Sequence, residues 1–281
     1  MKIFIVLDNK KNIKSPGDYL IKYNYYKSYS LFLAYSKNIN ILNTLILTTA
    51  DSIEILDIYL KGFSFPIMLR MDYSNFQNSK FIGGIPVYTL STLKKICLFL
   101  FNNGYIPVLQ SYANRFENIY SFGCSINKKD DELIIEFVGK GFDAGDLRLN
   151  LTNPHQIIRY DCTNWKILSN VIKNDEYLYA KEKRELYTGK METYFKYANS
   201  EYKLLNGKDF NLLEVGNSKI LNDEYIPVTK NQIEEAAYFS FNMKKNIMIS
   251  LPFSKDYIAS FSVLEGKKCV LWDIYGEWYH R

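Results

Sequence analysis

FPIMLRMDYS, at residues 65–74, opens the stretch of sequence that decides the fold. FIGGIPV follows at 81–87, TLSTLKKICLFLFNNG at 89–104, and YIPVLQSYANRFENIYSFGCS at 105–125. In order, these segments predict an apolar strand that carries a cation, a Gly-Gly turn, an amphipathic helix, and a strand that ends in polar residues. This order suits a site that grips a nucleoside triphosphate.

The cation is Arg70, which lies inside the apolar strand. A charge in such a strand is costly unless it is paired. A triphosphate would pair with it, because the guanidinium group matches phosphate oxygens well. The alternative partner is Asp72, two residues further along the same strand face.

The turn contains Gly83 and Gly84. Glycines allow backbone N–H groups to approach phosphate oxygens closely, although a Gly-Gly pair is also common in ordinary tight turns. No Gly-Lys-Ser/Thr follows, so the segment is not a Walker loop.

The last strand ends at Gln110–Ala113, which includes Tyr112. Such a hinge can bind an adenine edge through its main-chain groups, and Glu117 beyond it can accept hydrogen bonds from ribose hydroxyls. The alternative is a strand that simply leaves the sheet.

Hydrophobic patterning over the whole chain predicts an α+β fold, with antiparallel sheets flanked by helices. Strands are expected at Lys2–Leu7, Ile41–Leu47, Phe65–Met71, Pro107–Tyr112, Asn118–Ile126 and Leu133–Val138, with a hairpin of Tyr257–Leu264 and Cys269–Tyr275. Helices are expected from Asp18 to about Lys37, over Ala50–Tyr59 and Tyr88–Asn103, and from a capping box at Thr229–Gln232 to Phe241. Residues 150–164 are expected to be a loop, and 165–208 to be helical. We expect three lobes, at 1–60, 61–125 and 126–281.

These motifs together resemble the ATP-grasp family. The family pattern "fPvivKp" matches Phe65–Arg70, its Gly-rich loop matches Gly83-Gly84, and its hinge "vivQeyi" matches Val108–Ala113, with Glu117 beyond. The resemblance covers about residues 44–140 and implies an ATP-grasp-like fold. It implies that Arg70 and the glycines hold phosphates, and that Gln110, Tyr112 and Glu117 hold the nucleoside.

The chain departs from the family pattern at several positions. Arg70 replaces the usual lysine, and Ser111 replaces the usual hinge glutamate. The family binds magnesium near the end of the chain, through a carboxylate and then Glu-x-Asn on two adjacent strands. Here Asp273 is the candidate metal ligand, whereas Ser260 and Ser262 stand where the first carboxylate is expected. A salt bridge from Asp273 to a buried cation is the alternative.

A second dense segment, GKGFDAGDLRLNLTNPH, spans Gly139–His155. In the functional interpretation, Arg148 clamps an anionic acceptor and Asp146 or His155 moves protons. Arg115 could serve the same substrate. The alternative is a turn-rich connection in which aspartates cap backbone donors.

Composition limits the remaining classes of protein. The chain has 281 residues, 47% of them apolar, and a formal charge of +5 from scattered basic residues, which argues against a nucleic-acid footprint because such a footprint needs a clustered basic face. The four cysteines form no C-x-x-C pair, which argues against zinc and favours a reducing cytoplasm. The longest apolar runs are far short of a membrane span, so no membrane partner is expected.

The resemblance implies an enzyme that uses ATP and Mg²⁺ to activate a small-molecule or peptide carboxylate and joins it to an amine. Two alternatives stay open. One is a non-catalytic nucleotide-binding or partner-binding protein of degenerate ATP-grasp type. The other is a nucleic-acid-associated protein that uses its 24 tyrosines for base stacking.

Overall fold

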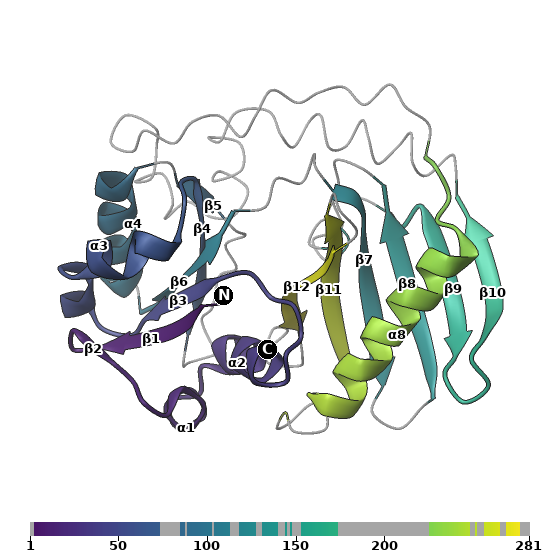
Figure 1. Ribbon diagram of the computed structural model, residues 1–281, viewed down its shortest axis with the longest axis horizontal. Coiled ribbons are helices and arrows are strands. Elements are labelled where there is room, and N and C mark those ends of the chain that lie inside the picture. The colour runs from purple at the N-terminus through teal and green to yellow at the C-terminus, as the bar shows by residue number, and fades with distance from the viewer. Residues whose placement is uncertain are drawn as a thin grey trace. The chain divides into compact units, whose positions relative to one another are not determined.

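The computed structural model describes residues 3–73, 85–87, 89–102, 104–112, 118–127, 131–139, 144, 147, 153–173, 225–247, 251, 256–264 and 268–275. They form two units: the first takes in the described residues up to 32 and from 41 to 112, and the second takes in 33–40 and those from 118 onward. Each unit is built on one six-stranded sheet (Figure 1). The α+β fold with largely antiparallel sheets and flanking helices is the one that the sequence predicts. The division into three lobes stays a prediction.

The first sheet has the strand order β2-β1-β3-β6-β4-β5. Its strands are β1 Phe4–Asp8, β2 Lys11–Asn12, β3 Thr44–Leu47, β4 Ile67–Asp72, β5 Ile85–Val87 and β6 Ile106–Ser111. The β1–β3 pair is parallel, which requires a crossover connection, and two helices supply it: α1 Pro16–Lys22 and α2 Tyr26–Ser36. The other pairs in this sheet are antiparallel.

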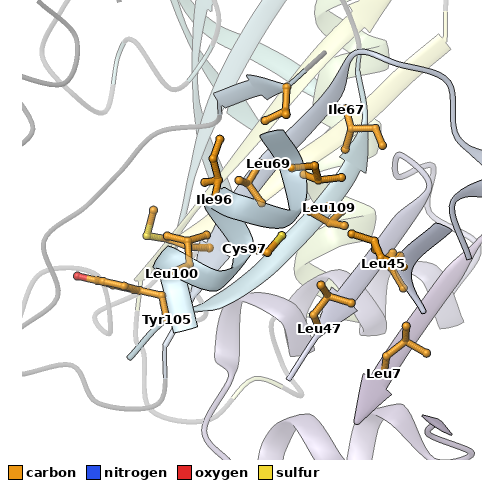
Figure 2. Close-up of a cluster of buried hydrophobic side chains, with 14 of the residues drawn as sticks. Leu7, Leu45, Leu47, Ile67, Leu69, Ile96, Cys97, Leu100, Tyr105 and Leu109 are labelled. Atoms are coloured by element: carbon orange, nitrogen blue, oxygen red, sulfur yellow. The ribbon is translucent and has the colours of Figure 1, made fainter. Parts of the chain in front are cut away.

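Both faces of the first sheet are covered by helices. Three short elements and one longer helix complete the unit: η1 Ala50–Ile53, α3 Leu56–Tyr59, η2 Leu60–Gly62 and α4 Leu90–Asn102. Alternation along the strands separates two apolar clusters. On the α4 face, strand residues Leu7, Leu45, Leu47, Leu69 and Leu109 pack with Ile96, Cys97 and Leu100 of α4 (Figure 2). On the α2 face, Val6, Ile46, Ile106 and Val108 pack with Leu20 and Leu31.

The amphipathic helix that the sequence places before Gly104 is confirmed as α4. Gly104 has a φ of 79°, the left-handed conformation that glycine adopts without strain. Its N–H donates to Phe101 O at 3.0 Å, and the N–H of Tyr105 donates to Leu100 O at 3.0 Å. This pair of bonds is a Schellman motif, so the helix ends where the sequence predicts.

The single helix predicted from Asp18 to Lys37 is wrong. The segment forms α1 and α2 with a break between them, where Asn24 has a φ of 59°. Asparagine enters this left-handed region more readily than most residues do, because its short amide bonds locally. The helix expected over Ala50–Tyr59 is likewise split, into η1 and α3.

The second sheet has the order β10-β9-β8-β7-β11-β12, and all its pairs are antiparallel. Its strands are β7 Asn118–Asn127, β8 Glu132–Val138, β9 Gln156–Asp161, β10 Lys166–Ile172, β11 Asp256–Leu264 and β12 Lys268–Tyr275. The predicted strands at Asn118–Ile126 and Leu133–Val138 and the predicted final hairpin are therefore confirmed.

Two expectations for this unit are wrong. The loop expected at 150–164 contains β9, and the helix expected from 165 begins with β10; residues 174–208 lie outside the described ones. The two strands form a hairpin because Asp161 closes the turn between them. Its carboxylate accepts hydrogen bonds from the backbone N–H groups of Thr163 and Asn164, at 2.8 and 3.2 Å.

One long helix, α8 Lys230–Asn246, packs on the second sheet (Figure 1). It begins with the predicted capping box: Thr229 and Gln232 each bond the other's backbone N–H. Val228 and Ile233 are buried on either side of this box, as expected of a hydrophobic staple. The helix runs five residues beyond the predicted end at Phe241.

The second sheet has one apolar and one polar face. The face toward α8 carries the buried residues Tyr120, Phe122, Cys124, Leu133, Ile135, Phe137, Ile158, Tyr160 and Phe261. The opposite face carries Ser121, Gly123, Glu136, Ser260 and Ser262, and we call it the serine face. On this face Ile134 is 41% exposed, whereas Ser121, Val138, Ser260 and Ser262 are buried.

Candidate functional site

The strand register brings Arg70 and Gln110 to the same face of the first sheet. Arg70 of β4 pairs with Val108 of β6, and Met68 pairs with Gln110. Directly paired residues and residues two apart point to the same side, so Arg70 and Gln110 are diagonal neighbours on the α2 face. Their separation is of the order that long side chains bridge, about 7–8 Å.

Gln110 is fully buried, and its side chain is only partly satisfied. Its Nε2 lies 3.4 Å from Thr44 Oγ1, which itself donates to Leu42 O at 2.9 Å. Because the hydroxyl proton is used in that bond, Thr44 can only accept from the amide, which fixes the amide orientation. Gln110 Oε1 then has no hydrogen-bond partner among the described residues. A buried acceptor in this state favours a donor from a ligand.

Asp72, the alternative partner of Arg70, has a structural task at the start of α2. One carboxylate oxygen accepts from Ser28 N at 2.7 Å and the other from Tyr73 N at 2.8 Å. The carboxylate therefore accepts from one of the free backbone N–H groups in the first turn of α2, that of Ser28, and from the backbone N–H of its own neighbour Tyr73. Complete burial raises the pKa of Asp72 to about 6, although the hydrogen bonds from Ser28 and Tyr73 and the charge of Lys27 act in the opposite direction.

Asp273, the candidate metal ligand, lies fully buried on β12 of the second unit. It pairs directly with Ser260 of β11, and the register shifts immediately beyond, where Trp272 is the extra residue of a bulge. Asp273 Oδ1 accepts from Ile274 N at 3.0 Å. One carboxylate and the neighbouring hydroxyl fit magnesium, which takes few protein oxygens and completes its shell with phosphates and water.

In the described part of the chain, no group of three His, Cys, Asp or Glu side chains is arranged to hold a metal ion. A metal at Asp273 would therefore depend on the serine face and on a bound phosphate. The hydroxyl of Ser260 fits this role, because Ser260 is 2% exposed and its Oγ has no partner among the described residues. By contrast, Ser121 and Ser262 bond each other at 2.8 Å.

His155 is buried just before β9. Its Nδ1 accepts from Gly139 N at 2.9 Å, and its ring lies 5.2 Å from that of Tyr225. Burial lowers the pKa of His155 to about 3, so the imidazole is neutral at physiological pH. One ring nitrogen is already engaged in the fold.

The structure tests the placement of some predicted site residues and not of others. Arg70 lies on β4 and Gln110 on the adjacent strand β6. The half-buried Tyr112 directly follows the end of β6. His155 and Asp273 belong to the second unit, at β9 and β12, which are separated by three strands. Outside the described residues lie Gly83, Gly84, Arg115, Glu117, Asp146 and Arg148.

Sequence reasoning missed two carboxylates. Asp72 was weighed only as a partner for Arg70, and nothing in the local pattern shows that it reaches α2. Glu136 is half-buried on the serine face, between the buried Ile135 and Phe137. The signal that could have revealed it is the position of Glu136 between two apolar residues of a strand, four residues after Glu132 and therefore on the same face.

No family model and no curated protein matches this chain. Solved structures of ATP-grasp enzymes do overlap with it. D-alanine–D-alanine ligase from Coxiella burnetii is 8% identical and overlaps with 93% of this chain at a TM-score of 0.46. The Bacillus anthracis ligase, complexed with ATP, is 12% identical over 89% at 0.40. An acetyl-coenzyme A synthetase from Ca. Korarchaeum cryptofilum is 11% identical over 93% at 0.46, and 97% of its own chain is covered.

The chain spans about half the length of the D-alanine–D-alanine ligases that it matches, 49% and 52% for the two above. Among the described residues, we find no helix with the length and apolar character needed to cross a membrane.

Proposed function

We propose that this chain is an ATP-grasp-like ligase that uses MgATP to activate a carboxylate and joins it to an amine or a similar nucleophile. The motif resemblance supports the reaction class. The observation that supports the proposal is the face that Arg70 shares with Gln110, whose buried Oε1 has no donor among the residues that the structure describes.

The roles follow the resemblance, position by position. Arg70, Gly83 and Gly84 hold the phosphates; Gln110, Tyr112 and Glu117 hold the nucleoside; Asp273 holds magnesium; Arg115 and Arg148 bind the acceptor; Asp146 and His155 move protons. The geometry limits His155: Nδ1 accepts from Gly139 N, so Nε2 of the neutral ring carries the hydrogen and its contribution is a hydrogen bond donated to the transferring group. Magnesium would supply charge neutralisation at the phosphates.

Isothermal titration calorimetry with MgATP tests whether Arg70 binds the phosphates. We expect the natural chain to bind and Arg70→Ala to lose measurable binding, because an arginine–phosphate contact is strong and directional. Arg159→Ala is the matched control: Arg159 is an exposed arginine on a strand of the second sheet that pairs with Glu132. Equal affinity of Arg70→Ala and the natural chain would refute the assignment.

A second candidate function, nucleotide binding without catalysis, is favoured by one observation. Ser260, and not a second carboxylate, stands opposite Asp273 in the β11–β12 register. A turnover assay with ATP, magnesium and a panel of carboxylates and amines separates the two functions. Release of ADP or AMP supports the ligase, whereas tight binding without release supports the non-catalytic protein.

We also propose a cytoplasmic location for the chain. The four cysteines are all free and buried, and burial raises the pKa of each thiol. Such thiols are typical of proteins from a reducing compartment.

A further inference from the structure

Asp72 is the last residue of β4 and lies on the same face of the first sheet as Arg70. The two residues are two apart in one strand, so their side chains point to the same side and their Cα atoms are about 7 Å apart. Across the strand pair, β6 places Ile106 directly beside Asp72. A phosphate held by Arg70 would therefore add negative charge on the face that carries the Asp72 carboxyl.

The Asp72 carboxyl is buried and is held by backbone donors. Its two oxygens accept from Ser28 N at 2.7 Å and from Tyr73 N at 2.8 Å, and both donors are uncharged. These bonds favour the ionised form, but burial outweighs them and raises the pKa of Asp72 to about 6. The bonds to Ser28 and Tyr73 fix the carboxyl in place, and its charge changes near neutral pH.

Four other ionisable groups belong to the surroundings of this carboxyl. Arg70 is the cation on the same strand face, and Lys27 of α2 carries a charge that lowers the pKa of Asp72. Tyr25, between α1 and α2, has its own pKa raised by burial and then by the charges of Asp72 and of Asp8 at the end of β1. Because that phenol is neutral near pH 6, the Asp72 carboxyl is the group whose charge changes there.

We propose that binding of a nucleotide at Arg70 is coupled to the uptake of a proton by Asp72. An ionised Asp72 repels a phosphate on the same face, whereas a protonated Asp72 does not, and burial limits the screening of this repulsion by salt. By reciprocity, the bound nucleotide strengthens the binding of the proton to the same extent. Asp72 thus acts on the phosphate through its charge and without touching it.

This coupling rests on the proposed function, since it needs a phosphate at Arg70. The sign follows from linkage: with a nucleotide bound, the pKa of Asp72 is higher than in the free chain. Affinity is therefore greatest below about pH 6, where Asp72 is protonated in both states, and it declines as the pH rises through the two pKa values. A separation of one pKa unit between the two states corresponds to a change of about 10-fold in affinity.

Calorimetric titration of the full chain with MgATP, repeated from about pH 5 to about pH 8, tests the coupling. We expect the dissociation constant to rise about 10-fold over this range, and proton uptake, measured in two buffers of different ionisation enthalpy, to peak between about pH 6 and 7. Asp72→Asn should remove both effects and leave only the titration of MgATP itself. Asp57→Asn is the matched control, because Asp57 is an exposed aspartate of the same unit that pairs with Lys94.

Lys27→Gln is a second variant that keeps the ionisable carboxyl and does not depend on the folding of Asp72→Asn. It removes a positive charge that favours the carboxylate, so the midpoint of the pH dependence should move to higher pH. Urea denaturation of each variant over the same pH range separates a change in binding from a loss of the fold.

Three results would overturn the coupling while the proposed function stands. They are the same pH dependence in Asp72→Asn as in the natural chain, a loss of that dependence in Asp57→Asn, and an unmoved midpoint in Lys27→Gln. In each of them MgATP still binds and Arg70→Ala still abolishes binding. No binding of MgATP at any pH, or unchanged binding in Arg70→Ala, would instead refute the proposed role of Arg70 and the coupling with it.

Discussion

The two sheets of this chain differ in how helices cover their faces. In the first sheet helices cover both faces, so neighbouring residues of one strand, such as Leu45 and Ile46, are both fully buried. In the second sheet α8 covers one face, where Ile135 is fully buried; on the other face exposure varies, because Ile134 is 41% exposed whereas Ser262 is fully buried. On the first sheet a polar side chain such as Gln110 is surrounded by apolar neighbours. On the second sheet the polar side chains of the serine face, such as Ser121 and Ser262, lie next to one another. The first arrangement suits a few defined contacts, and the second suits a broader polar surface.

The sharpest test of this comparison is a set of four alanine variants. Leu45→Ala and Ile46→Ala should each lower the free energy of unfolding by about 2–5 kcal/mol, because each leaves a cavity in a different core. Ile135→Ala should cost a similar amount, whereas Ile134→Ala should stay within about 1 kcal/mol. Urea denaturation measures all four. A large loss in Ile134→Ala, or a small one in either residue of the first sheet, would break the distinction.

A buried carboxylate gives the first unit a pH signature. The pKa of Asp72 is raised from its usual 3.8 to about 6, so the folded state holds its proton more tightly than the unfolded chain does. The contribution of the Asp72 carboxyl to the free energy of unfolding is therefore fully present below about pH 4. It is lost as the pH rises to 6, by about 3 kcal/mol in total. Asp72→Asn should flatten this part of the pH–stability curve, as measured by denaturant midpoints. An unchanged slope in the variant would assign the titration to other groups.

The start of α8 should give a smaller effect, confined to the second unit. Thr229→Ala removes the acceptor for Gln232 N and should cost about 1 kcal/mol. Thr229→Ser keeps the oxygen and is the control, with a change of a few tenths. Thermal unfolding of the two variants side by side measures the difference. An equal loss in both would show that the methyl group, and not the cap, matters.

Local signals in the sequence predicted several elements correctly. Gly104 ends α4 because glycine alone enters the left-handed region freely, and Thr229 with Gln232 begins α8 through bonds between residues three apart. The hairpin of β11 and β12 is indicated by the pattern of apolar and polar residues in its two strand segments. In each case, the physical cause lies within a few residues of the chain.

The wrong predictions of secondary structure concern features that leave only a weak signal in the local sequence or that depend on residues distant in the chain. The break at Asn24 depends on one residue's backbone conformation, and an apolar pattern continues across it. Strand β10 is an exposed edge strand, so burial gives it little alternation to detect. Arg70, Gln110 and Asp273 are site candidates that the sequence alone indicates and that stay predictions; the shared face of Arg70 and Gln110 depends on register between strands, which no local pattern encodes.

The central claim is that the α2 face of the first sheet grips a nucleotide through Arg70 and Gln110. A crystal structure of the chain with a non-hydrolysable ATP analogue and magnesium tests it most directly. We expect the Arg70 guanidinium group within hydrogen-bonding distance of a phosphate oxygen and Gln110 Oε1 accepting from the nucleoside. A nucleotide bound elsewhere, with both side chains unchanged, would contradict the claim.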